Sequence, residues 1–296
     1  MHILLTGGSG DLGQLLIHRA PPFHWDVVDV VPPKHGLGYY HECSILDREK
    51  FRQVLLRTHS DMVIHIAGWH GIHEKRGEKN EAEFHELNVV GTQNVLEVLR
   101  DLQKSDVQFM HISSTSVESD SVYGRSKREA ERVVNRHARL DGFDTLILRP
   151  RSFIPHWNRS IYETFPDWAK RFWGGAVHIE DVVGAVYKAI MRAMEGPWHY
   201  RSALVLDQKW EYAQEIVTKW EAWGGERIIR NYFGEESLVT ALTYGLSVTN
   251  APEVLVLRST ETEKFLRHSP RYGVRELLGE LSRYKGEFPP SPYEKQ

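Results

Sequence analysis

Short apolar runs rich in Val, Ile and Leu recur along the first half of the chain, and longer segments with helical spacing separate them. The runs are His2–Thr6, Trp25–Asp29, Met62–Ile66, Val107–Ile112 and Thr145–Leu148. Near-continuous apolar runs of this length are typical of parallel strands that helices cover on both faces. The pattern therefore predicts an α/β fold, a doubly wound parallel sheet assembled from βαβ units.

The regular pattern ends at Pro150, where a stretch dense in Trp, Phe, Pro and Arg begins and continues to Gly175. A strand-to-helix pattern returns at Ala176–Val182, and mixed short elements follow, up to a predicted helix at Val274–Tyr284. We therefore expect a first domain of residues 1–150, to which 176–195 returns. A smaller C-terminal domain would comprise residues 151–175 and 196–296.

Composition narrows the classes of function. The 296 residues carry a formal net charge of -3 with no basic block, so the electrostatic footprint of a nucleic-acid-binding protein is missing. No apolar run approaches the length of a membrane span, and we expect no membrane association. Cys43 is the single cysteine and cannot form an internal disulfide, which predicts a reducing compartment, the cytoplasm.

A glycine-rich turn follows the first predicted strand and opens a helix near Leu12. The spacing Gly7-x-x-Gly10-x-x-Gly13 lets the backbone approach a pyrophosphate, which the amides at the helix N-terminus then face. The second strand ends in Asp29, where a carboxylate can accept hydrogen bonds from an adenosine ribose. No arginine follows Asp29 to neutralise a 2′-phosphate, so the sequence predicts NAD in preference to NADP.

A tyrosine and a lysine begin another predicted helix. The four-residue spacing places Tyr123 and Lys127 on one face, where a neighbouring ammonium favours the phenolate form of tyrosine. The strand before this helix ends in Ile112, and Ser114 follows at the edge where ligands of parallel sheets bind. The three side chains are therefore candidate catalytic residues.

In the order of these motifs the sequence resembles the extended short-chain dehydrogenases/reductases, which include nucleotide-sugar epimerases, dehydratases and related oxidoreductases. The resemblance covers roughly residues 1–195 and implies a Rossmann fold, with the first domain binding the dinucleotide and the smaller one the substrate. The matching segments are Thr6–Gly13, Val63–Gly68, Asn88–Thr92, Ser114 with Tyr123-x-x-x-Lys127, Leu148–Pro150 and Val177–Val182.

The resemblance also implies roles for single residues. Tyr123 would exchange the proton of a substrate oxygen, Lys127 would lower its pKa and hold the nicotinamide ribose, and Ser114 would hydrogen-bond the reacting oxygen. Substrate contacts are expected from Ser114, Ser152 and Phe153. Cofactor contacts are expected from Gly7, Gly10, Asp11, Leu12, Gly13, Asp29, Ser44, Ile45, Ala67, Gly68, Asn88, Tyr123, Lys127 and Pro150.

Three departures from the family pattern narrow the reaction. Family dehydratases carry an Asp-Glu pair after the catalytic serine or threonine, whereas Thr115 and Ser116 stand here, which disfavours dehydration. Nucleotide-sugar members commonly carry an arginine where this chain has Gly174 and Gly175. Ser44 replaces the acid that usually precedes the aliphatic residue near the adenine.

The leading interpretation is an NAD-dependent epimerase or dehydrogenase that transfers hydride at a secondary alcohol or ketone of a sugar or nucleotide sugar. One alternative is an enzyme acting on a small carbonyl compound or free sugar, and another is an NAD-sensing regulatory protein without turnover. No metal site is predicted, because His70 and His73 have no third ligand at suitable spacing.

Family members commonly pair two helices into a four-helix bundle, so a homodimer is a further hypothesis. Its helices would be Asn88–Leu102 and Tyr123–His137. Apolar contact would come from Leu96, Leu99, Val133 and Val134, unless all four face their own core.

Overall fold

A computed structural model describes residues 1–20, 22–153, 157, 176–199, 203–209, 222, 224, 227, 230–231, 253–285 and 290–293. The chain divides into two compact units. The first comprises Met1–Arg149 and Val186–Leu204, and the second comprises Pro150–Ala185 and Val205–Gln296. Assignment of a dinucleotide-binding domain and a substrate domain to the two parts of the chain stays a prediction.

The sheet has seven strands in the order β3-β2-β1-β4-β5-β6-β7. Every pairing from β3 across to β6 is parallel, which confirms the doubly wound Rossmann-type sheet expected from the sequence. The strands are β1 (His2–Thr6), β2 (His24–Asp29), β3 (Tyr39–Glu42), β4 (Met62–His65), β5 (Gln108–Ile112), β6 (Thr145–Pro150) and β7 (Ala203–Leu206).

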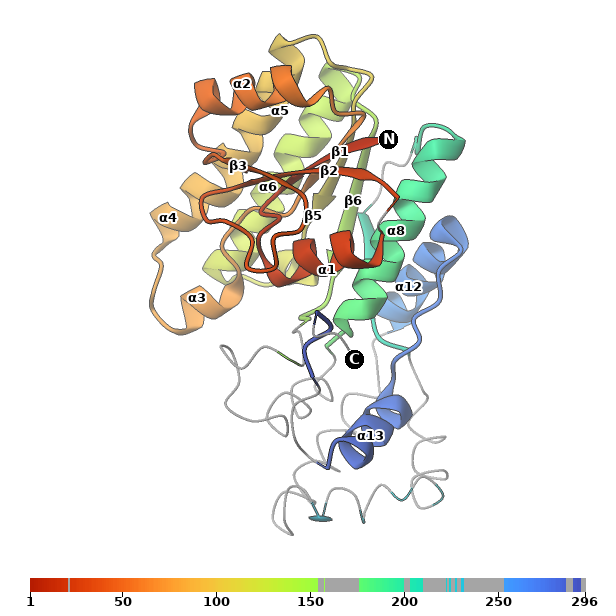
Figure 1. The fold of residues 1–296 in the computed structure, drawn as a ribbon. Coiled ribbons are helices and arrows are strands. Elements are labelled where there is room, and N and C mark those ends of the chain that lie inside the picture. The colour runs from red at the N-terminus through yellow and green to blue at the C-terminus, as the bar shows by residue number, and fades with distance from the viewer. Residues whose placement is uncertain are drawn as a thin grey trace. The chain divides into compact units, whose positions relative to one another are not determined.

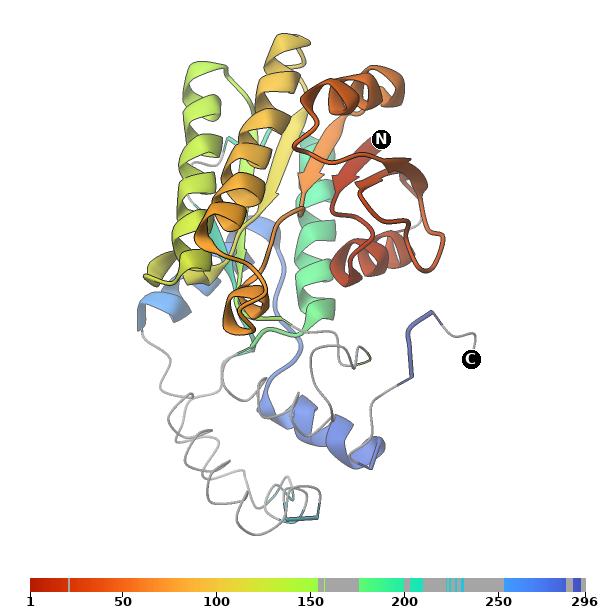
Figure 2. The ribbon, with the colours of Figure 1, turned by 90° about the vertical axis from the view of Figure 1, so that its left-hand side faces the viewer.

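Helices cover both faces of the sheet. Those of the described residues are α1 (Asp11–Arg19), α2 (Arg48–Thr58), α3 (Gly71–Lys75), α4 (Glu81–His85), the π-helix η1 (Glu86–Val90), α5 (Gly91–Asp101), the 3-10 helix η2 (Thr115–Glu118), α6 (Val122–Leu140), α8 (Ile179–Glu195), α12 (Glu253–Leu266) and α13 (Val274–Arg283). Figures 1 and 2 show α2, α5 and α6 on one face and α1 on the other. Within the described ranges, no helix combines the length and apolarity that crossing a membrane requires.

The main core lies between the sheet and the helices α2, α5 and α6. It contains Leu96, Leu99, Val133 and Val134, of which the most exposed is Val133 at 9%. The dimer hypothesis needs these side chains to face a second copy of the chain, and its alternative is that all four face their own core. They pack against the sheet and the neighbouring helices, as in the alternative. The homodimer therefore loses the apolar contact on which it was argued, and the oligomeric state stays a prediction.

The second unit has its own polar contacts. The carboxylate of Asp181, in the first turn of α8, accepts hydrogen bonds of 3.0 Å from the backbone amides of Arg271 and Tyr272. The ring of Tyr272 stacks on that of His178 with a centroid distance of 3.7 Å. The strand expected at the start of Ala176–Val182 does not form: residues 176–178 are irregular and α8 begins at Ile179.

Two side chains hold the N-terminus of α6. Ser121 accepts a hydrogen bond from the amide of Gly124 at 3.0 Å, as an N-cap residue does. Glu74 of α3 accepts hydrogen bonds from the amides of Val122 and Tyr123 at 2.9 and 3.0 Å. A carboxylate at this position also interacts favourably with the helix dipole. The first turn of α6 is thus tied to α3.

This arrangement yields a stability prediction. Replacing Glu74 by Ala leaves two amides without their acceptor, so the free energy of unfolding should fall by about 1–2 kcal/mol. Glu81→Ala is the matched control, because its exposed carboxylate pairs with Arg125 at the surface and should matter much less. Urea denaturation of both variants measures the difference. Equal losses would contradict the capping role.

Candidate active site

The candidate site lies where the parallel strands end. Thr6, Asp29, His65 and Ile112 are the last residues of β1, β2, β4 and β5, so they share one edge of the sheet. The strand order reverses at β1, because the chain adds β2 on one side of it and β4 on the other. In doubly wound folds the crevice at such a reversal is where ligands bind.

The glycine turn has the close packing that its spacing predicts. Gly7 has a φ of 71°, in the left-handed region, and a Cβ there would lie 2.6 Å from the backbone nitrogen of Ala67. A Cβ on Gly13 would lie 2.6 Å from the Cα of Gly8. Gly10 is the N-cap of α1 and makes no side-chain cap hydrogen bond, which leaves this helix end suited to an anion.

Asp29 is fixed beside this turn. Its carboxylate accepts hydrogen bonds from the amides of Ser9 at 3.1 Å and Val30 at 2.8 Å, so the end of β2 is joined to the glycine turn. The carboxylate is half-buried. A cradle that excludes Cβ atoms, an open helix N-terminus and an adjacent carboxylate fit the pyrophosphate and ribose of NAD.

Ser44 and Ile45, the residues expected near the adenine, make contacts within the protein. Ser44 follows β3, and its hydroxyl accepts a hydrogen bond from the amide of Leu46 at 3.1 Å. Ile45 is buried and its side chain packs closely against Gly91 of α5, so the side chain belongs to the core.

Asn88 joins the loop after β4 to α6. Within the π-helix η1, its Oδ1 accepts from the amide of Trp69 at 2.7 Å, and its Nδ2 donates to the Trp69 carbonyl at 3.0 Å and to the Ser126 hydroxyl at 2.9 Å. Ser126 in turn donates to the carbonyl of Tyr123 at 2.8 Å. A Cβ on Gly68 would lie 2.8 Å from Asn88 Oδ1, so the loop approaches closely. Asn88, expected among the cofactor contacts, thus positions the backbone of the candidate tyrosine.

His65 carries this network across the sheet. Thr92 donates its hydroxyl proton to the Asn88 carbonyl at 2.7 Å, so it must accept from Nε2–H of His65, at 2.9 Å. Nδ1 of His65 is then the acceptor for the hydroxyl of Thr6, at 2.7 Å. Burial, with the nearby ammonium of Lys127, lowers the pKa of His65 to about 3, so the ring is neutral.

Ser114 follows β5 and Tyr123 lies in the first turn of α6. The Ser114 hydroxyl accepts a hydrogen bond from the amide of Ser116 at 3.1 Å. Burial raises the pKa of Tyr123 above its ordinary value, and the nearby Ser114 side chain only partly opposes this. The sequence predicts the opposite direction, through Lys127. The ammonium of Lys127 instead donates to the Ile112 carbonyl at 2.8 Å.

Lys127 is 5% exposed, and burial lowers its pKa to about 8, an effect that Glu131 one turn later partly offsets. Glu131 is itself buried and accepts from Ser113 at 2.6 Å and from Nε of Arg149 at 2.8 Å. The carboxylate of Glu131 is therefore neutralised in part by Arg149 and hydrogen-bonded by Ser113, and it also raises the pKa of Lys127.

Sequence reasoning missed two side chains here. Glu74 lies on a short polar helix after β4, and only its contact with α6 shows its importance. His111 pairs in register with His65 across β4 and β5, and the two rings stack with centroids 5.4 Å apart. Burial beside Lys127 and His65 lowers the pKa of His111 well below its usual range. A histidine within an apolar strand run is the sequence signal that marks it.

Three expected site residues belong to the second unit. Pro150 ends β6, Ser152 is exposed, and Phe153 is half-buried. The carbonyl of Ser152 accepts from the amide of Val177 at 3.0 Å. Gly174 and Gly175 lie outside the described residues, as does most of the stretch from 154 to 175.

Comparisons with known proteins agree with this geometry. The profile of the NAD dependent epimerase/dehydratase family matches residues 3–200. An uncharacterised protein of Sinorhizobium fredii is 28% identical over 189 residues, 57% of this chain and 45% of that protein. The GDP-6-deoxy-D-talose 4-dehydrogenase of Aggregatibacter actinomycetemcomitans is 26% identical over 165 residues, 51% of this chain and 52% of the enzyme. The dTDP-D-glucose 4,6-dehydratase of Dictyostelium discoideum is 25% identical over 185 residues, 55% of this chain and 41% of the enzyme.

The chain spans about half the length of the curated relatives it matches. Solved structures show the same fold over more of it. The GalE-like L-threonine dehydrogenase of Cupriavidus necator aligns with a TM-score of 0.68 at 18% identity, over 96% of this chain and 100% of that one. The UDP-glucuronic acid 4-epimerase of Bacillus cereus, solved with NAD, aligns over 100% of both chains with a TM-score of 0.62 and 16% identity. The chain belongs to the NAD-dependent epimerase/dehydratase family, a family of enzymes of the extended short-chain dehydrogenase/reductase type whose cofactor is NAD.

Proposed function

We propose that this protein is an epimerase or dehydrogenase that transfers hydride at a secondary alcohol or ketone of a sugar or nucleotide sugar. The observation that carries the proposal is that the C-terminal ends of the strands bring Ser114, which follows β5, together with Tyr123 and Lys127 of α6, close enough for Ser114 to affect the pKa of Tyr123 and for Lys127 to donate to the Ile112 carbonyl. The glycine cradle and Asp29 lie at the same edge.

The proposed cofactor contacts follow from the described geometry. The amides after Gly10 would hold the pyrophosphate, Asp29 would accept from the adenosine ribose, and Lys127 would have protons left for the nicotinamide ribose besides the one given to Ile112. Bound NAD supplies the hydride acceptor or donor, and the chain supplies orientation and proton transfer.

The chain's own residues manage the proton at the reacting oxygen. With its pKa raised by burial, Tyr123 is protonated at neutral pH in the structure described here and is suited to donate a proton to a carbonyl oxygen. Ser114 is placed to hydrogen-bond the same oxygen. In the oxidative direction Tyr123 must first lose its proton, a change that a closer ammonium of Lys127 would favour.

Dehydration is disfavoured, although some relatives are named as dehydratases. Thr115 and Ser116 occupy the start of η2, where the family's dehydratases carry an Asp-Glu pair. Neither hydroxyl is an acid or base at neutral pH comparable to a carboxyl group. We therefore propose that the reaction ends with oxidation, reduction or epimerisation of the alcohol.

A small carbonyl compound or free sugar is the second candidate substrate. Gly174 and Gly175 replace the arginine that nucleotide-sugar members use for the diphosphate, which favours this alternative. Turnover of a panel of nucleotide sugars, free sugars and small hydroxy compounds with NAD distinguishes the two. No turnover on any of them, with NAD bound tightly, would favour a regulatory protein.

The cellular setting is part of the proposal. Cys43 is buried, and burial raises its pKa to about 11, so the only thiol of the chain is unreactive. This is compatible with the cytoplasm, and a small-molecule substrate rather than a macromolecule is the proposed partner.

The catalytic assignment predicts the effect of three substitutions. Tyr123→Phe removes only the hydroxyl, so NAD affinity should persist while turnover falls by roughly 10²- to 10⁴-fold. Ser114→Ala should mainly reduce turnover, and Lys127→Met should also weaken NAD binding. Tyr39→Phe is the matched control, since Tyr39 is an exposed residue of β3. Steady-state rates and NAD titration measure both effects, and unchanged turnover in Tyr123→Phe would remove this mechanism.

Cofactor choice provides a second test. A 2′-phosphate brought against the carboxylate of Asp29 meets like-charge repulsion of about 1–3 kcal/mol, so NADP should bind tenfold to over a hundredfold more weakly than NAD. Asp29→Asn keeps the shape of the side chain but removes its charge, so it should narrow the difference between the NAD and NADP affinities. Calorimetric titration of both cofactors decides the matter, and tighter binding of NADP to the unmodified protein would refute it.

The buried lysine predicts a pH dependence of stability. The pKa of Lys127 falls from 10.5 to about 8 on folding, so between these pH values the unfolded chain holds a proton that the folded chain has released. The free energy of unfolding therefore gains up to about 3 kcal/mol from this group as the pH rises through that window.

Lys127→Met lacks this contribution, so its stability advantage should be largest at pH 7 and shrink towards pH 10. Lys188→Met, at an exposed position of α8, is the control and should show no such trend relative to the unmodified protein. Denaturant unfolding across the pH series measures the differences. A Lys127→Met curve parallel to that of the unmodified protein would argue against a buried, destabilised ammonium.

A further inference from the structure

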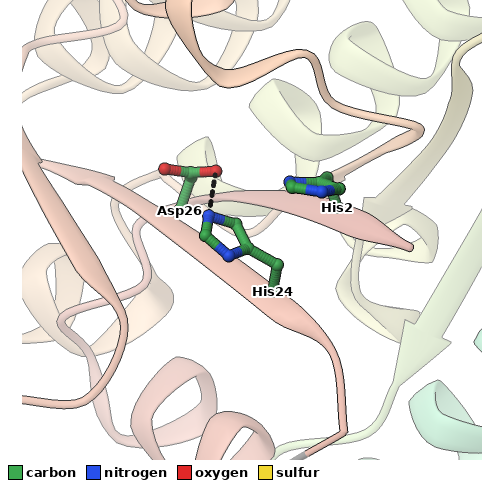
Figure 3. A group of neighbouring side chains, drawn as sticks. All are labelled: His2, His24 and Asp26. Atoms are coloured by element: carbon green, nitrogen blue, oxygen red, sulfur yellow. Dashed lines mark ion pairs between the residues drawn. The ribbon is translucent and has the colours of Figure 1, made fainter.

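A cluster of histidines lies at the N-terminal ends of the strands, whereas the candidate active site lies at their C-terminal ends. His2 opens β1 and His24 opens β2, and the two residues pair in register. Asp26 lies two residues along β2 from His24. Figure 3 shows the three side chains gathered over the two neighbouring strands. In the described part of the chain, this is the group whose ligand atoms are close enough together for one metal ion, all within 4.8 Å of one another.

The carboxylate of Asp26 is unusual in this cluster because it is buried and one of its oxygens has no hydrogen-bond partner among the described residues. Its side chain is 5% exposed, and Oδ1 accepts a hydrogen bond from Nε2 of His41 at 2.7 Å. Oδ2 is buried and has no hydrogen-bond partner among the described residues. Nε2 of His24 lies 3.6 Å from Oδ2, close enough for charge attraction but too far for a hydrogen bond. A buried carboxylate oxygen without a partner is costly, and a bound cation would satisfy it.

The two imidazoles are accessible and close together. His2 is exposed, and the side chain of His24 is 39% exposed. Their ring centroids are 4.4 Å apart, and the ring of His24 also stacks on Tyr39 at 4.7 Å. Protonating both rings would place two positive charges side by side, whereas two neutral rings can share one cation. The cluster therefore offers two nitrogen ligands at the surface and one oxygen ligand beneath them.

We propose that His2, His24 and Asp26 bind a divalent transition-metal ion, with Zn²⁺ as the best match. Two imidazoles and one carboxylate, with a fourth position left to water, are a common zinc ligand set. Mg²⁺ and Ca²⁺ prefer oxygen ligands, so they fit less well. His41 is a positioning residue, because its hydrogen bond to Oδ1 orients the carboxylate as metal-site neighbours do.

The sequence predicts no metal site, since the neighbouring pair His70 and His73 has no third ligand at suitable spacing. The ligands proposed here come from the starts of two strands, and His24 lies 22 positions after His2, so no local spacing reveals them. The site lies at the starts of β1 and β2, while the cofactor cradle follows their ends. The ion would accordingly clamp the two strands together and take no part in hydride transfer.

Zinc binding to the chelator-treated full chain tests the proposal. Equilibrium dialysis against Zn²⁺ alone, with metal quantified after dialysis, should show one ion per chain at a free concentration of about 1 µM. His24→Ala should lose this ion, with affinity reduced more than about 100-fold. His41→Ala should reduce affinity by roughly 10- to 100-fold, as the loss of a supporting residue does. His85→Ala, which removes an exposed imidazole of α4 outside the cluster, should bind like the unmodified protein.

Two further measurements keep the result unambiguous. Zn²⁺ should raise the thermal unfolding midpoint of the unmodified protein and of His85→Ala but not of His24→Ala. NAD titration should give the same affinity for all three, which shows that His24→Ala is folded. Absence of a bound ion at micromolar Zn²⁺, or equal zinc binding by His24→Ala and His85→Ala, would overturn the proposal.

Discussion

A continuous chain of hydrogen bonds, buried except for its last member, joins the strand before the glycine turn to the helix of the candidate tyrosine. It runs from Thr6 through His65 and Thr92 to the backbone and side chain of Asn88, and from there through Ser126 to the carbonyl of Tyr123. Because each buried donor and acceptor is matched, displacing one member leaves its neighbour unsatisfied. The glycine turn and the first turn of α6 are therefore held in a fixed relation, and the candidate chemistry depends on that relation.

Burial at the same place in the fold also determines the protonation states of the candidate site residues. Burial and the ammonium of Lys127 keep His65 neutral, and its hydrogen bonds to Thr6 and Thr92 fix which ring nitrogen carries the proton. Lys127 is the group whose pKa burial brings near the physiological range, and Glu131 limits how far it falls. Burial raises the pKa of Tyr123, which makes the side chain less able to act as a base at neutral pH. Proton transfer at the site is thus set by burial as much as by the spacing of tyrosine and lysine.

Much of the fold could be predicted, because strands buried on both faces leave a direct record as apolar runs. β3 could not, since Tyr39–Glu42 is polar and pairs at the edge of the sheet. The segment before α8 is apolar without forming a strand. The sequence also predicts Ser114, Tyr123 and Asn88, but not Glu74, which reaches α6 from 48 residues away. Leu96 and Val134 illustrate a further limit: periodicity shows that a helix face is apolar, but not whether the chain's own sheet or a partner covers it.

The π-helix η1 has a consequence for how the chain tolerates changes in length. A π-turn accommodates one residue more than an α-turn, and each residue of an α-helix turns the chain by about 100°. Deleting one residue from Glu86–Val90 would therefore tighten the π-turn to an α-turn and leave α4 and α5 on nearly the same faces. The change would fall on the turn that carries Asn88, whose hydrogen bonds to Trp69 depend on the width of that turn. The width of the turn, and not only the identity of the asparagine, thus places this side chain.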